Sequence, residues 1–300
     1  APEMLAAAHG GRMKALYILG ENPMLSFPDQ TKVQESLQKL DFLIVQDIFL
    51  TETAQLADVV LPATCFAEKD GTFTNSERKV QRVRKAVDPA GNAQDDSWII
   101  SQIAAKMDYP MDSASSQVLS EINDLVPDYA GMTWPRLEKG SLTWPCPDPD
   151  HPGSPLLHAG SFARGRGLFS CIEYRSALEE PDAEYPYTLS LGSVLEHHQS
   201  GTMTREGSGL SRLCPQALAE LNPIDAQQLG VSNGDTLAIS SRRGHMRIKA
   251  RVCDRTAPGV VFVPIHFRES PANILTAFTQ EHAAMIPELK ACAVSIQKVA

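Results

Sequence analysis

The sequence predicts a parallel, doubly wound α/β layer followed by a small closed β barrel. In the first hundred residues, short apolar strands alternate with helical segments, as they do when helices connect the strands of a parallel sheet. In the last third, short strands of alternating apolar and polar residues surround one short helix, which is typical of a small barrel. We therefore expect domains at 1–108 and 184–300, joined by an irregular, proline-rich connector at 109–183.

Three helix-and-strand pairs build the predicted α/β layer. Its strands are expected at 15–19, 41–45 and 58–61. Helical segments at 3–10, 30–39 and 51–56 precede these strands, and an amphipathic helix at 97–107 closes the domain. Because the strands are apolar almost throughout, we expect both faces of the sheet to be buried.

Polar turns follow each of these strands. They are Gly20-Glu21-Asn22-Pro23, Gln46-Asp47 and Pro62-Ala63-Thr64. Such a turn can simply close a loop, or it can bind a ligand, because ligands of open parallel sheets lie beyond the carboxyl ends of the strands. The residue types leave both possibilities open.

The predicted barrel has one well-defined helix. Asn222 is a good N-cap, Pro223 suits the first helical position, and Gly230 ends the helix. A hairpin turn is expected at 241–245, with Gly244 free to take a positive φ. Strands are expected at 187–191, 235–240, 246–252 and 260–264.

Composition narrows the class of protein. The chain has 300 residues, of which 43% are hydrophobic and 21% charged, as in a globular protein. Its net charge of -9 argues against nucleic acid as a partner. No apolar run approaches the roughly 20 residues that span a bilayer, so no membrane insertion is expected. The first residue is not methionine and a helical run follows at once, so we expect a piece of a longer protein.

The six cysteines are scattered along the chain and form no CxxC pair. The sequence therefore predicts neither a local zinc or iron–sulfur site nor a disulfide framework. Scattered thiols favour a cytoplasmic location by default. No GxGxxG motif follows a strand, which argues against a nicotinamide dinucleotide site.

Three polar segments have competing interpretations. His197 and His198 could bind a metal, but neighbours on an extended chain point in opposite directions, which favours one structural histidine and one facing a ligand. The loop at 192–212 could surround a phosphate or be an ordinary flexible loop. The charged stretch at 66–98 is, in the simpler interpretation, a salt-bridged exterior.

Taken together, several blocks resemble one enzyme family. The chain resembles the C-terminal half of a molybdopterin oxidoreductase of the dimethyl sulfoxide reductase superfamily, and is most similar to the formate dehydrogenase catalytic subunit. The blocks are LYILGENP, LIVQDIFLTETAQLADVVLPATCFAEKDGTFTNSERKVQR, DDSW, SGTMTR, NPIDAQQLGV, GDTLAISSRRG, PANILT and PELKACAV. The resemblance implies that the C-terminal barrel is a double-psi β barrel.

The resemblance also implies a cofactor: two molybdopterin guanine dinucleotides that chelate molybdenum or tungsten. In the α/β layer, the implied cofactor-binding residues are Glu21, Asn22, Gln46, Asp47, Lys69 and Asp96. A carboxylate suits guanine, because it accepts from both the ring N–H and the exocyclic amine. In the barrel, the implied residues are Gly192, Val194, Leu195, His197, His198, Gly201, Thr202, Met203, Thr204, His266, Asn273 and Lys290.

The resemblance implies that the catalytic residues belong to another part of the complete protein. The family's iron–sulfur cysteines, its metal-binding cysteine or selenocysteine and its neighbouring histidine belong to the N-terminal half, so no catalytic residue is assigned here. The expected activity is oxidation of formate to carbon dioxide, with electron-transfer or hydrogenase-type partner subunits. The alternatives are a nitrate reductase-type enzyme and a non-catalytic scaffold related to the iron–sulfur subunit of respiratory complex I.

Overall fold

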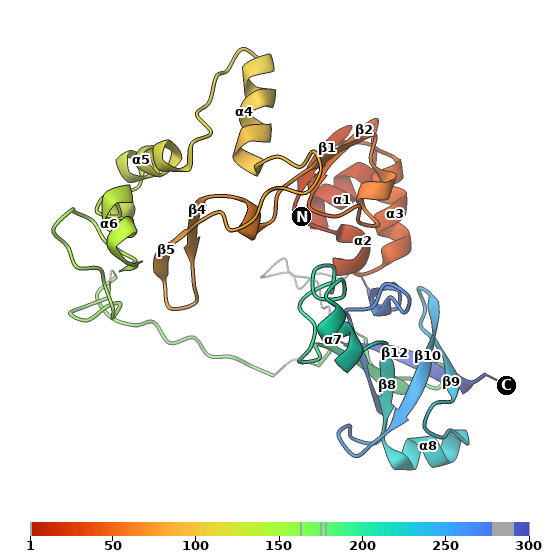
Figure 1. Cartoon of the computed structure of the whole chain (residues 1–300). Helices are drawn as coiled ribbons and strands as arrows, with labels where there is room; N and C mark the ends of the chain where they lie inside the picture. The colour runs from red at the N-terminus through yellow and green to blue at the C-terminus, as the bar shows by residue number, and fades with distance from the viewer. Residues whose placement is uncertain (1, 163, 175, 178, 278–290, 300) are drawn as a thin grey trace. The chain divides into compact units, whose positions relative to one another are not determined.

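The computed structural model describes residues 2–162, 164–174, 176–177, 179–277 and 291–299 (Figure 1). The chain forms two compact units. The first consists of Ala1–Val45, Phe49–Val59 and Tyr174–Ala300, and the second of Gln46–Ile48 and Val60–Glu173. In the part of the chain that is described, no helix has the length and apolar character needed to cross a membrane.

The α/β layer is confirmed, and its elements lie close to the predicted ranges. In chain order they are α1 (Pro2–His9), β1 (Ala15–Leu19), α2 (Pro23–Ser26), α3 (Gln30–Gln38), β2 (Phe42–Asp47), η1 (Ala54–Leu56) and β3 (Val59–Pro62). The third predicted helix is only the 3-10 turn η1. The sheet order is β1-β2-β3. The N–H of Asp58 donates to Leu43 O, and four residues further along β2 the N–H of Ala63 donates to Asp47 O, so β2 and β3 run parallel.

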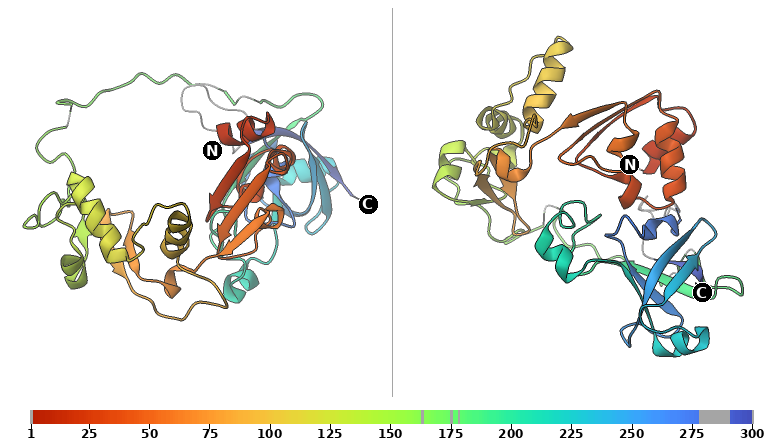
Figure 2. Two further views of the ribbon diagram at one scale, coloured as in Figure 1. Left: turned by 90° about the horizontal axis from the view of Figure 1, so that it is seen from above. Right: turned by 45° about the vertical axis from the view of Figure 1, so that its right-hand side comes forward.

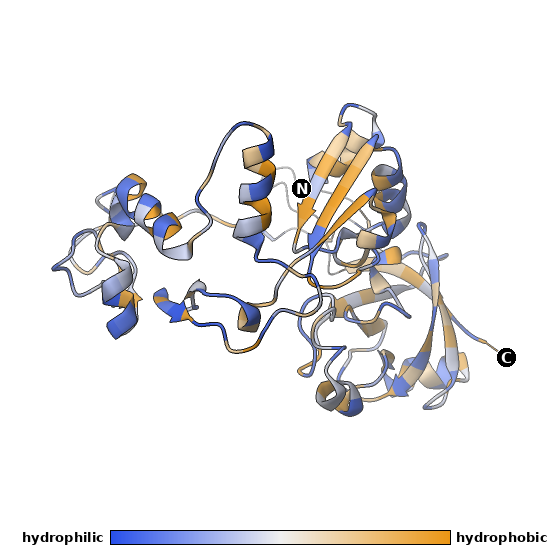
Figure 3. Cartoon of the chain, turned by 45° about the horizontal axis from the view of Figure 1, so that its top comes forward, coloured by the Kyte–Doolittle hydropathy of each residue, from blue (hydrophilic) through white to orange (hydrophobic). Residues whose placement is uncertain are grey.

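One face of this sheet has a well-packed core. Ile18, Leu43 and Val45 are buried against apolar side chains of α1 and α3. On the strands, Tyr17, Leu19, Phe42 and Val59 are between 37% and 46% exposed. The prediction that both faces are buried is therefore wrong for the residues described, although the strands are apolar nearly throughout (Figure 3). The apolar residues of the strands favour burial on both faces, but a face is buried only where another element packs against it.

The predicted barrel is confirmed as a closed barrel of six strands, in the order β10-β8-β11-β7-β12-β9 (Figure 2). Its elements are β7 (Tyr187–Gly192), α7 (Ser208–Leu213), β8 (Leu218–Leu221), α8 (Pro223–Leu229), β9 (Thr236–Ser240), β10 (His245–Val252), β11 (Val260–Pro264), η4 (Ala272–Ile274) and β12 (Ala291–Lys298). The pairs β7–β11 and β8–β10 are parallel, and the remaining pairs are antiparallel. Pairing of β9 with β10 closes the ring.

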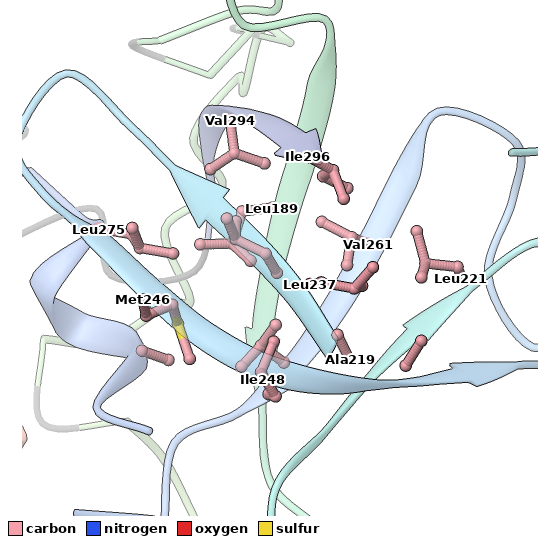
Figure 4. Packing of buried hydrophobic residues seen from close by; sticks show 14 of the residues in the cluster. Leu189, Ala219, Leu221, Leu237, Met246, Ile248, Val261, Leu275, Val294 and Ile296 are labelled. Carbon is pink, nitrogen blue, oxygen red and sulfur yellow. The ribbon is translucent and has the colours of Figure 1, made fainter. Parts of the chain in front are cut away.

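Alternation along the strands fills the barrel with apolar side chains (Figure 4). In β10, Met246, Ile248 and Ala250 are buried, while Arg247 and Lys249 between them are exposed. Leu237 and Val261 are fully buried in the same cluster. The barrel core is thus a direct consequence of the period of two in a strand.

Both ends of α8 and the hairpin turn at 241–245 are confirmed, and only the conformation of Gly244 differs from the prediction. The Asn222 side chain caps α8 by accepting from the N–H of Ile224, and Gly230 ends the helix with φ 64°. Gly244 does not take a positive φ. A Cβ at Gly244 would lie 2.9 Å from the carbonyl oxygen of Ile274, so close packing of the backbone, rather than turn geometry, explains the glycine.

The second unit contains more regular structure than the sequence predicts. Its elements are η2 (Phe66–Glu68), β4 (Gly71–Thr74), β5 (Lys79–Val83), α4 (Asp96–Lys106), α5 (Ser115–Leu125), η3 (Pro127–Tyr129), α6 (Trp134–Lys139) and β6 (Leu142–Thr143). Strands β4, β5 and β6 form an antiparallel sheet. Val80, Leu119, Met132, Leu137 and Cys146 form a small core. The irregular character predicted for 109–183 is therefore wrong for its first part, while the domain boundaries stay predictions.

The barrel core generates a stability prediction. Leu237→Ala removes a fully buried side chain, so we expect the free energy of unfolding to fall by about 2–5 kcal/mol. Urea unfolding followed by circular dichroism measures this change. Leu213→Ala, at a side chain that is 73% exposed, is the control and should change it by less than about 1 kcal/mol. Equal losses in the two variants would contradict the packing described.

Candidate functional site

The turn after β1 is built by a glycine and a buried asparagine. Gly20 has φ 63°, a conformation that glycine takes without strain. Asn22 is 5% exposed, and its Nδ2 donates to Glu52 while its Oδ1 accepts from the hydroxyl of Thr53 at 2.7 Å. The hydroxyl of Ser26 donates to the carboxylate of Glu21. The Asn22 side chain is thus engaged with the loop before η1, which it fixes beside the turn.

The loop after β7 is held by two buried histidines. His266 is 1% exposed, and His197 is 5% exposed. The Nε2 of His266 accepts from the N–H of Val194 at 3.0 Å, and its Nδ1 contacts the carbonyl oxygen of Gln199 at 2.5 Å. Burial lowers the pKa of His266 below its usual value, so the ring stays neutral.

His197 and His198 differ in their surroundings: His197 is buried and structural, as predicted for one of the two, while a ligand-facing role of His198 stays a prediction. The Nε2 of His197 lies 2.9 Å from the carbonyl oxygen of Cys214, and its Nδ1 lies 3.2 Å from the hydroxyl of Thr204. His198 is exposed. Within the described ranges, no group of three or more histidine, cysteine, aspartate or glutamate residues is placed to hold a metal ion.

Gly201 is the tightest point of this loop. It has φ 76°, and a Cβ there would lie 2.4 Å from the carbonyl oxygen of His266. Its own carbonyl accepts from the N–H of Arg205 at 2.8 Å. Only glycine fits this close approach, so the loop is packed against the backbone of His266 rather than free.

A pocket of about 290 Å³ lies in the first unit. Its lining combines hydroxyls, two carboxylates and two guanidinium groups, which is a polar set that can both donate and accept hydrogen bonds. It is lined by Leu25, Phe49, Leu50, Thr51, Glu52, Ser200, Gly201, Thr202, Arg205, Glu206, His266 and Arg268. Three of the sequence-predicted residues are therefore in this pocket: Gly201, Thr202 and His266.

Arg205 is the most strongly held charge of this pocket. Its guanidinium donates to Glu269 at 2.7 Å and lies 4.6 Å from the centre of the Phe267 ring. Burial acts to raise the pKa of the Glu269 carboxyl, but the hydrogen bond and charge of Arg205 outweigh it, and the pKa is lowered. The Nε of Arg205 is buried without a hydrogen-bond partner. A buried donor of this kind is satisfied when an acceptor is bound beside it.

Asn273 connects the barrel to the α/β layer within the first unit. It is 6% exposed, and its Nδ2 donates to the carbonyl oxygen of Leu25 at 2.7 Å. Its own carbonyl oxygen accepts from the N–H of Asp29. The side-chain amide and the backbone carbonyl of Asn273 thus join the barrel to the α/β layer. Lys290, the last predicted barrel residue, lies outside the described residues.

The second unit brings together three of the other predicted residues. Gln46 is fully buried at the end of β2, and its Nε2 donates to Asp96 at 2.7 Å. The Nζ of Lys69 forms an ion pair with the other oxygen of Asp96. Asp96 is the first residue of α4, where the helix N-terminus favours a carboxylate. Asp47 follows Gln46 and accepts from the N–H of Ile48.

Much of the charged stretch at 66–98 matches the simpler interpretation, a salt-bridged exterior, but the Arg82 side chain is only 6% exposed and Arg78 donates to backbone carbonyls. Arg82 and Arg84 both contact Glu138. Lys79 pairs with Glu77, and Lys85 pairs with Asp88. Only the pair of Lys69 with Asp96 in this stretch is joined to another predicted site residue.

The remaining predicted residues lie along the loop after β7. Leu195 is 99% exposed and Met203 is 51% exposed. Gly192 ends β7, where a Cβ would lie 2.6 Å from the Phe262 ring. The Thr204 hydroxyl, by contrast, contacts Nδ1 of His197 and accepts from the N–H of His198 within the same loop.

Sequence reasoning missed Glu52, Thr53 and Arg268 of the pocket and its supports, whereas Arg205 belongs to the loop at 192–212 that was considered for phosphate binding. The polar triplet Thr51-Glu52-Thr53 between apolar residues was the available signal for the first two. Arg268 carries no local signal, because it enters the pocket only through the packing of the segment after β11.

The chain thus combines an α/β layer with a closed six-stranded barrel, and both parts match family models of molybdopterin enzymes. Residues 1–106 match the family model "Molybdopterin oxidoreductase", and residues 187–293 match the model "Molydopterin dinucleotide binding domain". The chain belongs to the molybdopterin oxidoreductases.

Individual relatives agree with this family. The chain is 46% identical, over 99% of its length and 45% of the relative, to the "F420-dependent formate dehydrogenase subunit alpha" of Methanocaldococcus jannaschii. It is 36% identical, over 99% of its length and 43% of the relative, to a nitrate reductase of Symbiobacterium thermophilum. The chain thus spans less than half the length of these curated relatives.

A solved structure shares the fold. The acetylene hydratase of Pelobacter acetylenicus matches with a TM-score of 0.76 and 21% identity, over 99% of this chain and 46% of that one. At this identity the likeness concerns the fold alone.

The residues present fit a molybdopterin dinucleotide. Gly201 lets the loop pack closely on the backbone of His266, and in the part of the chain that is described the buried Nε of Arg205 is a donor without a hydrogen-bond partner. The hydroxyls of Ser200 and Thr202 line the same pocket. Backbone, hydroxyl and guanidinium donors together are the set that binds phosphate and pterin oxygens.

Gly201 provides a test of the loop geometry. We expect Gly201→Ala to lower the free energy of unfolding by about 1–3 kcal/mol, because the residue has a positive φ and no room for a Cβ. Chemical denaturation measures this. Gly209→Ala is a matched control in open space, and should change stability by less than about 0.5 kcal/mol. Equal stability of the two variants would contradict the packing of the loop on His266.

Proposed function

We propose that this chain is the cofactor-holding part of a formate dehydrogenase alpha subunit, which oxidises formate to carbon dioxide, one proton and two electrons. The observation that carries the proposal is the 46% identity to a formate dehydrogenase alpha subunit, which extends over 99% of this chain. The polar clusters after β1, β2 and β7 support it, because each contains residues that the resemblance assigned to the cofactor.

The proposed cofactor is a pair of molybdopterin guanine dinucleotides with molybdenum or tungsten, which supplies the redox chemistry when it is bound. In this proposal the α/β side serves one guanosine, and the residues that the resemblance assigns to it are Glu21 and Asn22 in the first unit and Asp47, Lys69 and Asp96 in the second. The loop at 192–204, with His266, Asn273 and Lys290, serves the other dinucleotide. The chain's own contribution is binding and orientation.

The contacts sort these residues into two proposed roles. Asn22, His197, His266 and Asn273 are buried and hydrogen-bonded to the protein, so they shape the site. In this proposal, the residues that contact the ligand are among those lining the pocket, including Thr202 and Arg205. The proposal assigns no catalytic residue to this chain.

The complete enzyme is proposed to include an iron–sulfur cluster and electron-transfer or hydrogenase-type partner subunits. All six cysteines of this chain are free thiols that are not grouped as cluster ligands, so a cluster would be held by other residues. A cytoplasmic location is part of the same proposal.

A nitrate reductase-type enzyme is the second candidate, because a nitrate reductase is 36% identical over nearly the whole chain. The higher identity to the formate dehydrogenase subunit favours formate. Assays of the complete protein with formate and an artificial electron acceptor, and with nitrate and a reduced dye, separate the two. Nitrate reduction without formate oxidation would overturn the proposal. A scaffold without cofactor would show neither activity and no bound molybdenum or tungsten.

Two substitutions test the dinucleotide sites. In the complete protein, we expect Asp47→Ala and Lys290→Ala each to weaken retention of guanine dinucleotide by about tenfold or more, because each removes charge-assisted hydrogen bonds. The measurement is guanine nucleotide released by acid per mole of protein. Asp41→Ala is the control, since this exposed carboxylate pairs only with Lys14 at 3.7 Å in the structure described. Unchanged occupancy in both site variants would exclude the assignment.

A further inference from the structure

His266 fixes the loop after β7 at two backbone points. Its Nε2 lies 3.0 Å from the nitrogen of Val194, and its Nδ1 lies 2.5 Å from the carbonyl oxygen of Gln199. These two points are five residues apart in the sequence, so one imidazole ring closes this part of the loop. The next turn is packed on the same residue, because a Cβ at Gly201 would reach the carbonyl oxygen of His266.

The two partners determine which nitrogen of His266 carries the proton. A carbonyl oxygen can only accept, so Nδ1 must donate to Gln199. A backbone N–H can only donate, so Nε2 must present its lone pair to Val194. The ring is therefore neutral with its hydrogen on Nδ1. A second proton would place two donors face to face and break the bond to Val194.

His197 provides a contrast within the same loop. Its Nε2 must donate to the carbonyl oxygen of Cys214. Its Nδ1 faces the hydroxyl of Thr204, which can either donate or accept. When His197 is protonated, this hydroxyl can rotate and accept the new hydrogen. The hydrogen bonds of His197 tolerate both charge states, whereas those of His266 tolerate one.

The surroundings of His266 also oppose its protonation. Burial lowers its pKa most, the hydrogen bond to Gln199 raises it, and the nearby His197, His198 and Arg205 lower it. The centroids of the His197 and His266 rings are 5.9 Å apart, and Phe267 packs against both. The other charged groups of the pocket and its rim are Glu52, Glu206, Arg268 and Glu269, of which Glu269 is paired with Arg205 and Glu206 with Arg268.

We propose that His266 is a positioning residue that holds the loop at 194–201 only in its neutral form with the hydrogen on Nδ1, and that its protonation releases the loop. The link from this loop to cofactor retention rests on the proposed function. The control of the loop by His266 does not rest on the proposed function, because all of its contacts lie within the protein.

The pKa of His266 in the released loop determines how the stability of the closed loop depends on pH. In a released loop, His266 takes up a proton at its ordinary pKa of 6.5, whereas in the closed loop the pKa is lower. The closed loop is therefore fully stable above that value and loses stability as the pH falls below it. In this range, the ratio of closed to open loop falls by about tenfold for each pH unit.

Nitrogen NMR of the full chain with 15N-labelled histidine tests the tautomer directly. We expect His266 to be neutral with its hydrogen on Nδ1, and His197 to carry its hydrogen on Nε2. Spectra of His266→Gln and His197→Gln assign the signals. At neutral pH, His266 should give the signals of the neutral form, because burial lowers its pKa. A His266 that is protonated at neutral pH, or that carries its hydrogen on Nε2, would overturn the proposal.

Amide hydrogen exchange in segments covering 194–201 tests the release, after correction for the intrinsic effect of pH on exchange. In the unaltered chain, protection should fall as the pH drops below 6.5, by at most about tenfold per pH unit, until the lowered pKa of the closed loop is reached. In His266→Gln, the side-chain oxygen can accept from Val194 but does not titrate, so this acid step should disappear. His245→Gln, at an exposed hairpin position, should keep it.

Two outcomes separate this inference from the proposed function. An acid step that persists in His266→Gln rejects His266 as its origin, whatever the cofactor content. A step that is lost in His266→Gln and kept in His245→Gln supports the inference even if the complete protein holds no molybdopterin. Cofactor retention against pH in the complete protein then tests whether the released loop also releases the ligand.

Discussion

The junction at Asn273 is the interaction on which the first unit depends. One buried side chain donates to the carbonyl oxygen of Leu25, and the backbone carbonyl of the same residue accepts from Asp29. Because these groups are buried, breaking the junction would leave donors and acceptors without partners, at a cost of about 1–3 kcal/mol each. The junction connects the turn region after β1 to the segment after β11, and the pocket is lined by residues from both parts.

A molecule that binds a large polar cofactor must bury polar groups without leaving them unsatisfied. Asn22, His197 and His266 illustrate how this chain does so: each is buried, and each has its polar atoms hydrogen-bonded to the protein. In the proposed function, the cofactor-facing groups are backbone, hydroxyl and guanidinium donors held in place by these residues. The division explains why residues matched to a binding motif are not all contact residues.

Local patterns were enough to predict most elements of the α/β layer and barrel. The strand at 15–19, the cap at Asn222 and the alternation in β10 all follow from interactions within a few residues. Strands β8 and β12 escaped prediction, because their pairing with β10, β11, β7 and β9 is set by barrel closure. The elements α5 and α6 escaped because their small core is formed with Val80, which is remote in sequence.

The sequence by itself determined the fold class, the polar turns after the strands and the family to which they point. These depend on residue periodicity and on short motifs, which are properties of neighbouring residues. Only the tertiary structure decided the role of each polar side chain. Gln46 and Asp96 are 50 residues apart, and His266 and Val194 are 72 residues apart, yet each pair is hydrogen-bonded. Whether such a group holds the protein or faces a ligand depends on long-range packing, which no local pattern specifies.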